Sequence, residues 1–331
     1  MEPVELPSAK RFTAKFWVKT ALTILVLGFV GYRAWTLVRG QDFSQFSICP
    51  GWLALSGLFY ALGWGPSIWF WKNLLGSMGE TPGWILCGKA YFAGHLGKYI
   101  PGKAGVLLLR AGVLKGRKFG FGAGVLTAAY ETLTFMGIGL VVAGSLAPAL
   151  VPPETLTRWS ETIPVVFESR WVPGIVLCAF TLLATPAIAV ILSKLGKQFA
   201  STAVPDVRIS NGQLLKGFAA FILSWGLLGL SLGAAIQSVS DRPFALADWP
   251  VWTAAASAAT VIGFFAVFTP GGLGVREGIM IEILRIQPEI LQSQAVFAAV
   301  LLRLVWMATE AVVYVAFSWF EKRGHRLKAQ G

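Results

Sequence analysis

The sequence predicts an all-α polytopic membrane protein, and three observations support that prediction. Hydrophobic residues make up 55% of the 331 positions. Charged residues make up 13%, about half the share found in an average soluble domain. The mean hydropathy is +0.66, and apolar runs long enough to cross a bilayer recur along the chain. We therefore expect one integral membrane domain over residues 1–331, with six full spans and two re-entrant broken-helix hairpins.

The first expected span covers residues 16–38. A polar tail precedes it and contains Lys10, Arg11 and Lys15. A cleaved signal peptide is the alternative, but residues 31–35 form a poor cleavage site.

Two copies of one pattern interrupt later apolar stretches. Residues 94–106 and 263–275 align at a constant offset of 169 positions. The positions that match are Gly94, Pro101, Gly102, Gly105 and Val106 in the first copy, and Gly263, Pro270, Gly271, Gly274 and Val275 in the second. Pro-Gly is costly inside a membrane because it leaves backbone groups without partners. Each copy is therefore predicted to be the break between two helical legs of a hairpin.

The other apolar segments complete the expected order. They are assigned as spans at 51–71, 119–147, 171–192, 214–239 and 290–320, with hairpins at 82–114 and 250–286. The sequence span, broken hairpin, span occurs twice. We expect repeat 1 over 51–147 and repeat 2 over 214–320, with 171–192 as a linking span.

Loop charges orient these segments. Basic residues gather in the N-terminal tail and in 115–118, 194–208 and 322–328, whereas 40–48, 148–170 and 240–250 are acidic or mixed. Cytoplasmic loops carry the excess of Lys and Arg. Placing every basic loop in the cytoplasm puts both termini there and makes the two hairpins enter the plasma membrane from opposite sides. This is an inverted-topology repeat, which is typical of transporters. A full crossing by the longer leg of each hairpin remains the alternative.

The first break has the chemistry of an anion site. Pro101, Gly102, Lys103 and Gly105 lie at the start of a short helix, whose N-terminus offers unpaired N–H groups and a positive dipole end. The nearby basic residues are Lys98, Lys103 and Arg110, with His95 as a further donor. Such cations at membrane depth need a negative partner, and a phosphate head group is a suitable one. The alternative is that both lysines snorkel to the interface.

The second break is a glycine turn backed by opposite charges. Its residues are Pro270, Gly271, Gly272 and Gly274, followed by Arg276 and Glu277. Glu277 suits a first helical turn, whereas Arg276 opposes the helix dipole and needs an anionic partner. That partner is expected to be Glu277, Glu131 or a ligand. The alternative is that both residues pair with neighbouring helices.

Three further charges lie deep in expected spans. They are Glu131, Arg303 and Glu310. Glu131 and Arg303 occupy similar places in the two repeats, so we expect a buried pair between them, acting either as a lock between states or as a static strut. Glu131, Glu277 and Glu310 are the candidate proton carriers.

At these residues the chain resembles the flippase-like transmembrane domain of the lysylphosphatidylglycerol synthase family. The resemblance covers almost the whole chain, and T-P-G-G-L-G-V-R-E-G at 269–278 is its most specific part. The family pattern maps onto Pro101, Gly102, Gly105, Arg110, Glu131, Pro270, Gly271, Gly272, Gly274, Arg276, Glu277 and Arg303. Synthases of that family carry a soluble aminoacyl-transferase domain after the membrane part, for which 331 residues leave no room. The resemblance therefore implies the translocation module and not synthase activity.

The sequence favours a non-enzymatic flippase-like protein that binds or moves an anionic phospholipid or a polyprenyl-phosphate-linked precursor. No cofactor, metal or nucleic acid is expected, since the three Cys and two His are scattered and no nucleotide-binding motif occurs. A homo-oligomer or a cell-envelope enzyme is a possible protein partner. The alternative function is a non-transporting scaffold or accessory subunit of a glycolipid or envelope enzyme. A third is an intramembrane transferase with Glu131 or Glu277 as base.

Overall fold

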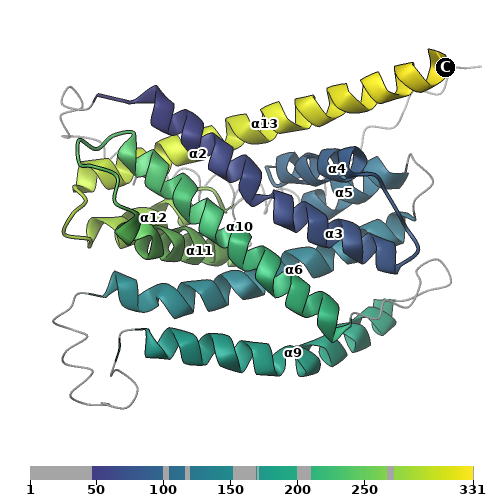
Figure 1. Ribbon diagram of the computed structural model, residues 1–331, viewed down its shortest axis with the longest axis horizontal. Helices are drawn as coiled ribbons and strands as arrows, with labels where there is room; N and C mark the ends of the chain where they lie inside the picture. Colours follow the sequence, from purple (N-terminus) through teal and green to yellow (C-terminus); the bar gives the residue numbers. More distant parts are fainter. Residues whose placement is uncertain are drawn as a thin grey trace, which may run out of the picture.

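The computed structural model describes residues 47–99, 104–115, 120–151, 169, 171–199, 210–266 and 272–330. This part of the chain is helical and contains no strand, so the predicted all-α class is confirmed (Figure 1). The helices that are long and apolar enough to cross a membrane are Phe121–Leu150, Val172–Ile191, Asn211–Gln237 and Gln292–Gly324. The first expected span, 16–38, lies outside the described residues.

The second expected span is divided into two helices. Helix α2 (Pro50–Gly63) and helix α3 (Gly65–Ser77) follow each other end to end, with Trp64 between them (Figure 1). Pro66 lies in the first turn of α3, where its missing N–H costs nothing and where it interrupts a continuous helix.

Helix α10 (Asn211–Gln237) packs antiparallel to α2 and α3. Its Ser231 bonds to Ser56 of α2, and its Ser224 bonds to Ser67 of α3. Small side chains at this interface let the two backbones approach closely, as is usual between helices in membranes.

Each of the two segments predicted as hairpins contains a packed pair of helices. The first consists of α4 (Trp84–Gly97) and α5 (Ala104–Lys115), and the second of α11 (Trp249–Phe265) and α12 (Val275–Arg285). Residues 100–103 and 267–271, which connect these helices, lie outside the described residues, and with them Pro101, Gly102, Lys103, Pro270 and Gly271.

The repeated glycines allow the legs of each hairpin to touch. A Cβ atom on Gly94 would lie 2.6 Å from Cγ of Arg110, on the returning leg. A Cβ atom on the matching residue, Gly263, would lie 3.0 Å from Cβ of Arg276. Both distances are too short for ordinary packing, so the same glycine serves the same close approach in the two copies.

Three more helices belong to the described part of the bundle. They are α6 (Phe121–Leu146), extended by a 3₁₀ turn η2 (Ala147–Leu150), α9 (Val172–Phe199), which packs along α6 at one edge of the molecule, and α13 (Gln292–Gln330) (Figure 1). A short 3₁₀ turn, η3 (Leu246–Asp248), leads into α11.

The hairpins exchange partners between the two halves of the chain. The first leg of each hairpin packs on the last helix of the other half, α4 on α13 and α11 on α6. The second leg packs on the last helix of its own half, α5 on α6 and α12 on α13. The contact pattern is therefore reciprocal.

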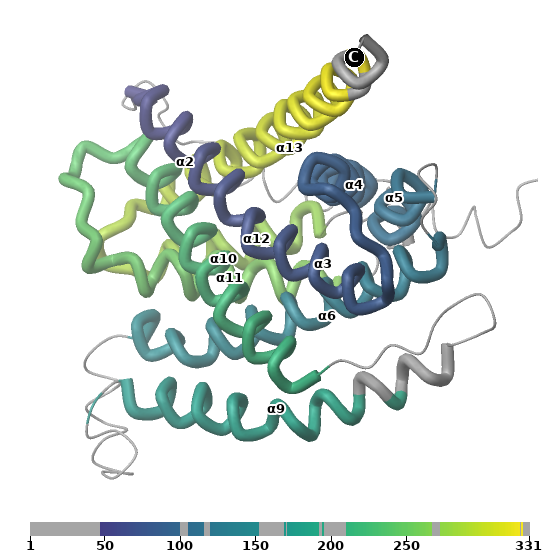
Figure 2. The backbone as a smooth tube through the Cα atoms, turned by 45° about the vertical axis from the view of Figure 1, so that its right-hand side comes forward, coloured from purple at the N-terminus to yellow at the C-terminus, as the bar shows by residue number. Residues whose placement is uncertain are grey.

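The hairpins also extend in opposite directions along α13. Lys89 of α4 pairs with Glu321 near the C-terminal end of α13, whereas Met280 of α12 shares a cavity with Ala299 and Leu302 near its N-terminal end. Figure 2 shows α4 and α5 on one side of the bundle and α11 and α12 on the other. The end of α4 and the start of α12 consequently lie over the middle of α13, where Lys98 pairs with Glu310 and Glu277 lies next to Arg303.

Candidate functional site

A cluster of polar side chains lies where the end of α4 and the start of α12 meet α13. We call it the tip cluster. Its members come from α2, from the two hairpins and from α13, and they are Tyr60, His95, Lys98, Tyr99, Arg276, Glu277, Arg303, Trp306 and Glu310. Arg303 and Glu310 lie in the middle third of the candidate span Gln292–Gly324, where charges are expensive and therefore point to function.

Glu310 forms the centre of one half of the tip cluster. Its side chain is 0% exposed, and its carboxylate accepts hydrogen bonds from the Tyr60 hydroxyl and the Lys98 ammonium. The Tyr99 hydroxyl donates to the other carboxylate oxygen at 3.0 Å. Nδ1 of His95 lies 3.5 Å from the first oxygen. Every oxygen of this carboxylate is thus occupied by donors from α2 and from the end of α4.

Arg303 forms the centre of the other half, and its guanidinium is poorly satisfied. Its Nε, Nη1 and Nη2 atoms are buried and donate no hydrogen bond to any described residue. The nearest carboxylate is that of Glu277, whose Oε1 lies 3.5 Å from Nη1. The other Glu277 oxygen accepts from the Gly274 amide at 2.6 Å, so it is held at the start of α12. A buried charged group without partners costs far more than a neutral one.

Arg276 lies beside Arg303 and faces the same cavity. Its guanidinium carbon is 4.1 Å from the centre of the Trp306 ring, a cation–π geometry. The cavity measures about 10 Å³ and is lined by Arg276, Glu277, Met280, Ala299, Leu302, Arg303 and Trp306. That is room for about one water molecule.

The glycine turn before α12 places these groups. Gly272 and Gly274 have φ values of +68° and +82°, in the left-handed region that other residues avoid. A Cβ atom on Gly272 would also lie 2.9 Å from the Gly263 carbonyl oxygen. The turn therefore brings the first residues of α12 tightly against the end of α11.

Glu131 is paired with Arg110, and the expected Glu131–Arg303 pair is wrong. Arg110 Nη1 donates to Glu131 Oε2 at 2.5 Å, and the Tyr91 hydroxyl donates to Oε1 at 2.7 Å. Arg110 also lies over the Tyr91 ring, 3.8 Å from its centre. The physical reason is local, since α5 packs on α6 and delivers a cation to Glu131 from the same half of the chain.

The tyrosine hydroxyls were not foreseen from the sequence. Tyr60 and Tyr99 serve Glu310, and Tyr91 serves Glu131. A usable signal was present, because Tyr91, His95 and Lys98 are spaced by four and three residues and so share one helix face.

The structure brings most of the described candidates together. Lys98, Arg276, Glu277, Arg303 and Glu310 belong to the tip cluster, and Gly272 and Gly274 shape it. Lys98 turns to Glu310, so the snorkelling alternative does not describe it. Gly105 instead packs against Gly97, and Arg110 is occupied by Glu131.

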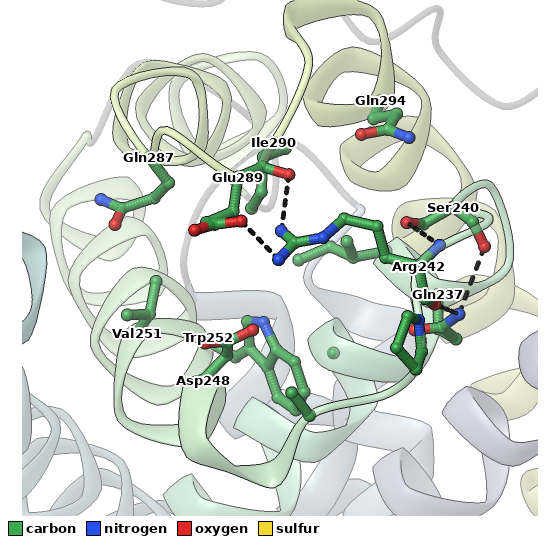
Figure 3. A pocket seen from close by; sticks show the side chains of 14 residues that line it. Gln237, Ser240, Arg242, Asp248, Val251, Trp252, Gln287, Glu289, Ile290 and Gln294 are labelled. Atoms are coloured by element: carbon green, nitrogen blue, oxygen red, sulfur yellow. Dashed lines mark hydrogen bonds and ion pairs between the residues drawn. The ribbon is translucent and has the colours of Figure 1, made fainter.

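A second pocket of about 60 Å³ lies at the base of the second hairpin (Figure 3). Arg242, in the loop between α10 and α11, crosses it to reach Glu289, in the loop between α12 and α13. The Gln237 amide donates to the Ser240 and Arg242 carbonyl oxygens on the same rim. The pair ties the two loops that flank the second hairpin.

No protein-family model and no curated protein sequence matches the chain. Within the described residues, no group of three or more His, Cys, Asp or Glu is placed to hold a metal ion. The three cysteines are free thiols.

Proposed function

We propose that this protein binds the phosphate-bearing head group of an anionic lipid or lipid-linked precursor between its hairpin tips and moves it across the plasma membrane. The observation that supports this most strongly is the buried Arg303 guanidinium, which has no hydrogen-bond acceptor among the described residues and lies beside a second arginine. Guanidinium groups match phosphate oxygens in charge and geometry, so such a ligand would supply the acceptors that Arg303 lacks.

The charge balance of the tip cluster supports the same ligand class. Lys98, Arg276 and Arg303 are three cations, whereas Glu277 and Glu310 are two carboxylates. With His95 neutral, one positive charge is left over. In a medium of low dielectric constant, an excess cation favours the binding of an anion.

The arrangement of the hairpins supports movement as well as binding. Opposed hairpins with reciprocal packing fit the inverted-topology repeat that six spans and two re-entrant segments would form. In such repeats the ligand lies at the interface between the halves, and one half rocks against the other. The tip cluster, which takes side chains from both hairpins, occupies the corresponding place. Movement of a lipid is also what the resemblance to flippase-like transmembrane domains implies.

The size of the cavity implies a movement under this proposal. A volume of about 10 Å³ cannot hold a head group. The end of α4 and the start of α12 therefore move apart when a lipid enters, while the acyl or prenyl tail stays in the bilayer.

Reconstituted liposomes test the proposal. Fluorescent phosphatidylglycerol and phosphatidylcholine are incorporated, and the fraction that reaches the outer leaflet is followed by chemical quenching. The wild type is expected to move the anionic lipid faster than empty liposomes do, and Arg303→Gln and Arg276→Gln are expected to lose that gain. Arg285→Gln is the matched control, because Arg285 lies on α12 but pairs with Glu282 on the surface. A wild-type rate equal to that of empty liposomes for every anionic lipid tried would refute transport and favour a scaffold.

A further inference from the structure

Glu310 occupies donors that an anionic ligand of the tip cluster would otherwise use. The Lys98 ammonium, the Tyr60 hydroxyl and the Tyr99 hydroxyl all point to its carboxylate. These are the same types of donor that recognise a phosphate. Arg303, seven residues earlier on α13 and therefore on the same helix face, donates no hydrogen bond to a described residue.

Tyr99 connects the half of the tip cluster around Glu310 with the half around Arg303. Its hydroxyl lies 3.0 Å from Glu310 Oε2, and the centre of its ring lies 5.2 Å from the guanidinium carbon of Arg303. Lys98, the preceding residue, forms an ion pair with Glu310. An anion held by Arg303 would therefore lie close to Lys98 and would compete with Glu310 for it.

We propose that Glu310 is an internal competitor that sets the affinity of the tip cluster for anions. In the absence of ligand, its carboxylate holds Lys98 and ties the first hairpin to α13. A bound anion takes over Lys98, which releases this tie and lets the end of α4 move away from α13. Glu310 thus determines which head groups are bound. Only an anion that outcompetes the Glu310 carboxylate gains Lys98 in addition to the two arginines. This inference rests on the proposed function and adds a specificity-determining residue to it.

The chain contains a matched control for this contact. Lys89 and Glu321 form a second lysine–glutamate pair between α4 and α13, with Nζ and Oε2 2.8 Å apart, remote from the tips. Removing the Glu321 charge frees a lysine on the same helix without changing the tip cluster. Any general effect of an unpaired lysine on α4 would appear in Glu321→Gln as well.

The test measures binding of a defined probe to the purified full chain in neutral detergent. The probe is phosphatidylglycerol with a fluorescent acyl chain, and phosphatidylcholine with the same label is the neutral reference. Glu310→Gln is expected to bind the anionic probe at least about tenfold more tightly than the wild type, since one charge-assisted hydrogen bond is worth about that much. In the double variant Lys98→Gln/Glu310→Gln the gain is expected to disappear, and Glu321→Gln is expected to match the wild type.

Each other outcome has a defined meaning. Unchanged or weaker binding by Glu310→Gln overturns the inference, and so does a gain that survives the loss of Lys98. If Arg303→Gln abolishes wild-type binding while Glu310→Gln has no effect, the proposed function stands and only the competitor role fails. If neither wild type nor Glu310→Gln prefers the anionic probe, both fail. Should Glu310→Gln not fold, Glu310→Asp withdraws the carboxylate by one methylene and is expected to bind more tightly than wild type, and equal affinity would again overturn the inference.

Discussion

Arg110 and Glu131 form an ion pair inside one half of the molecule, with Nη1 and Oε2 2.5 Å apart and side-chain exposures of 3% and 1%. The Tyr91 hydroxyl and ring complete the shell around them. The pair joins α5 to α6 and has no direct contact with Arg303 among its described partners. Because the pair is buried inside one half, we expect it to have a structural role, distinct from that of the tip cluster.

Glu131→Gln is expected to destabilise the protein by about 3–5 kcal/mol, because it leaves the Arg110 charge buried without a counter-ion. The midpoint of thermal unfolding in detergent measures this change. Glu282→Gln is the control, since Glu282 pairs with Arg285 on the surface, where such pairs contribute about 0.5 kcal/mol or less. Equal midpoints for the two variants would contradict the structural role.

The double variant Arg110→Met/Glu131→Met separates charge from packing. Replacing a buried pair as a whole with apolar groups is often nearly neutral. We therefore expect most of the stability lost in Glu131→Gln to return in the double variant. A double variant that is less stable than Glu131→Gln would show that the ion pair itself provides the stability.

Gly97→Ala is expected to lower stability by about 1–3 kcal/mol, because its Cβ atom would lie 2.7 Å from the Gly105 carbonyl oxygen. Gly112→Ala on the returning leg is expected to be neutral or to stabilise by up to about 1 kcal/mol, because no atom lies within 4 Å of its Cβ position. The midpoints of thermal unfolding of the two alanine variants measure this difference. The close packing of the first hairpin would be disproved by two alanine variants that behave alike.

Ser231→Ala is expected to cost about 0.6–1.7 kcal/mol, between the average and the maximum found for hydrogen bonds between membrane helices. Ser231 Oγ accepts from Trp306 Nε1 at 2.9 Å and donates to the Ser56 carbonyl at 2.8 Å, so it links α2, α10 and α13. Ser318→Ala removes a hydroxyl that bonds only within its own helix, to the Tyr314 carbonyl, and serves as the reference. A larger loss for Ser318→Ala would argue against this link.

Single cysteines on a cysteine-free background test the orientation of the hairpins. Lys115→Cys at the end of the first hairpin and Lys322→Cys near the end of α13 are expected to react with a membrane-impermeant thiol reagent only from the cytoplasmic side. Glu289→Cys, beyond the second hairpin, is expected to react only from the other side. All three side chains are exposed. Labelling of Lys115→Cys and Glu289→Cys from the same side would rule out opposed entry.

The sequence predicted the architecture better than it predicted the site. Apolar runs and the repeated Pro-Gly pattern were sufficient to predict two helices in each of the segments 82–114 and 250–286, and the structure has α4 and α5 in the first and α11 and α12 in the second. The split of span 51–71 at Trp64 was missed, although Pro66 marks it. Hydropathy reports how apolar a segment is and not whether its helix is continuous.

The repeated sequence pattern could not predict which buried charges pair with each other. The similar positions of Glu131 and Arg303 in the two repeats suggested an ion pair between them. The partner of a buried carboxylate depends instead on which helix faces it. Arg110 reaches Glu131 because α5 returns along α6, and Lys98 reaches Glu310 because α4 lies on α13. Such contacts follow from the crossing of helices that are distant in sequence, which single-sequence periodicity does not encode.

Helix α13 runs without interruption for 39 residues, about 58 Å, and Lys98 and Glu277 contact it within two turns of each other, at Glu310 and Arg303. A continuous helix of this length transmits rotation and translation along its axis, whereas the divided α2–α3 segment can bend at Trp64. A rotation of α13 about its own axis would carry Arg303 and Glu310 together and would displace their contacts with the end of α4 and the start of α12 at the same time. Under the proposed topology, a movement of either hairpin would therefore be transmitted to the other through α13.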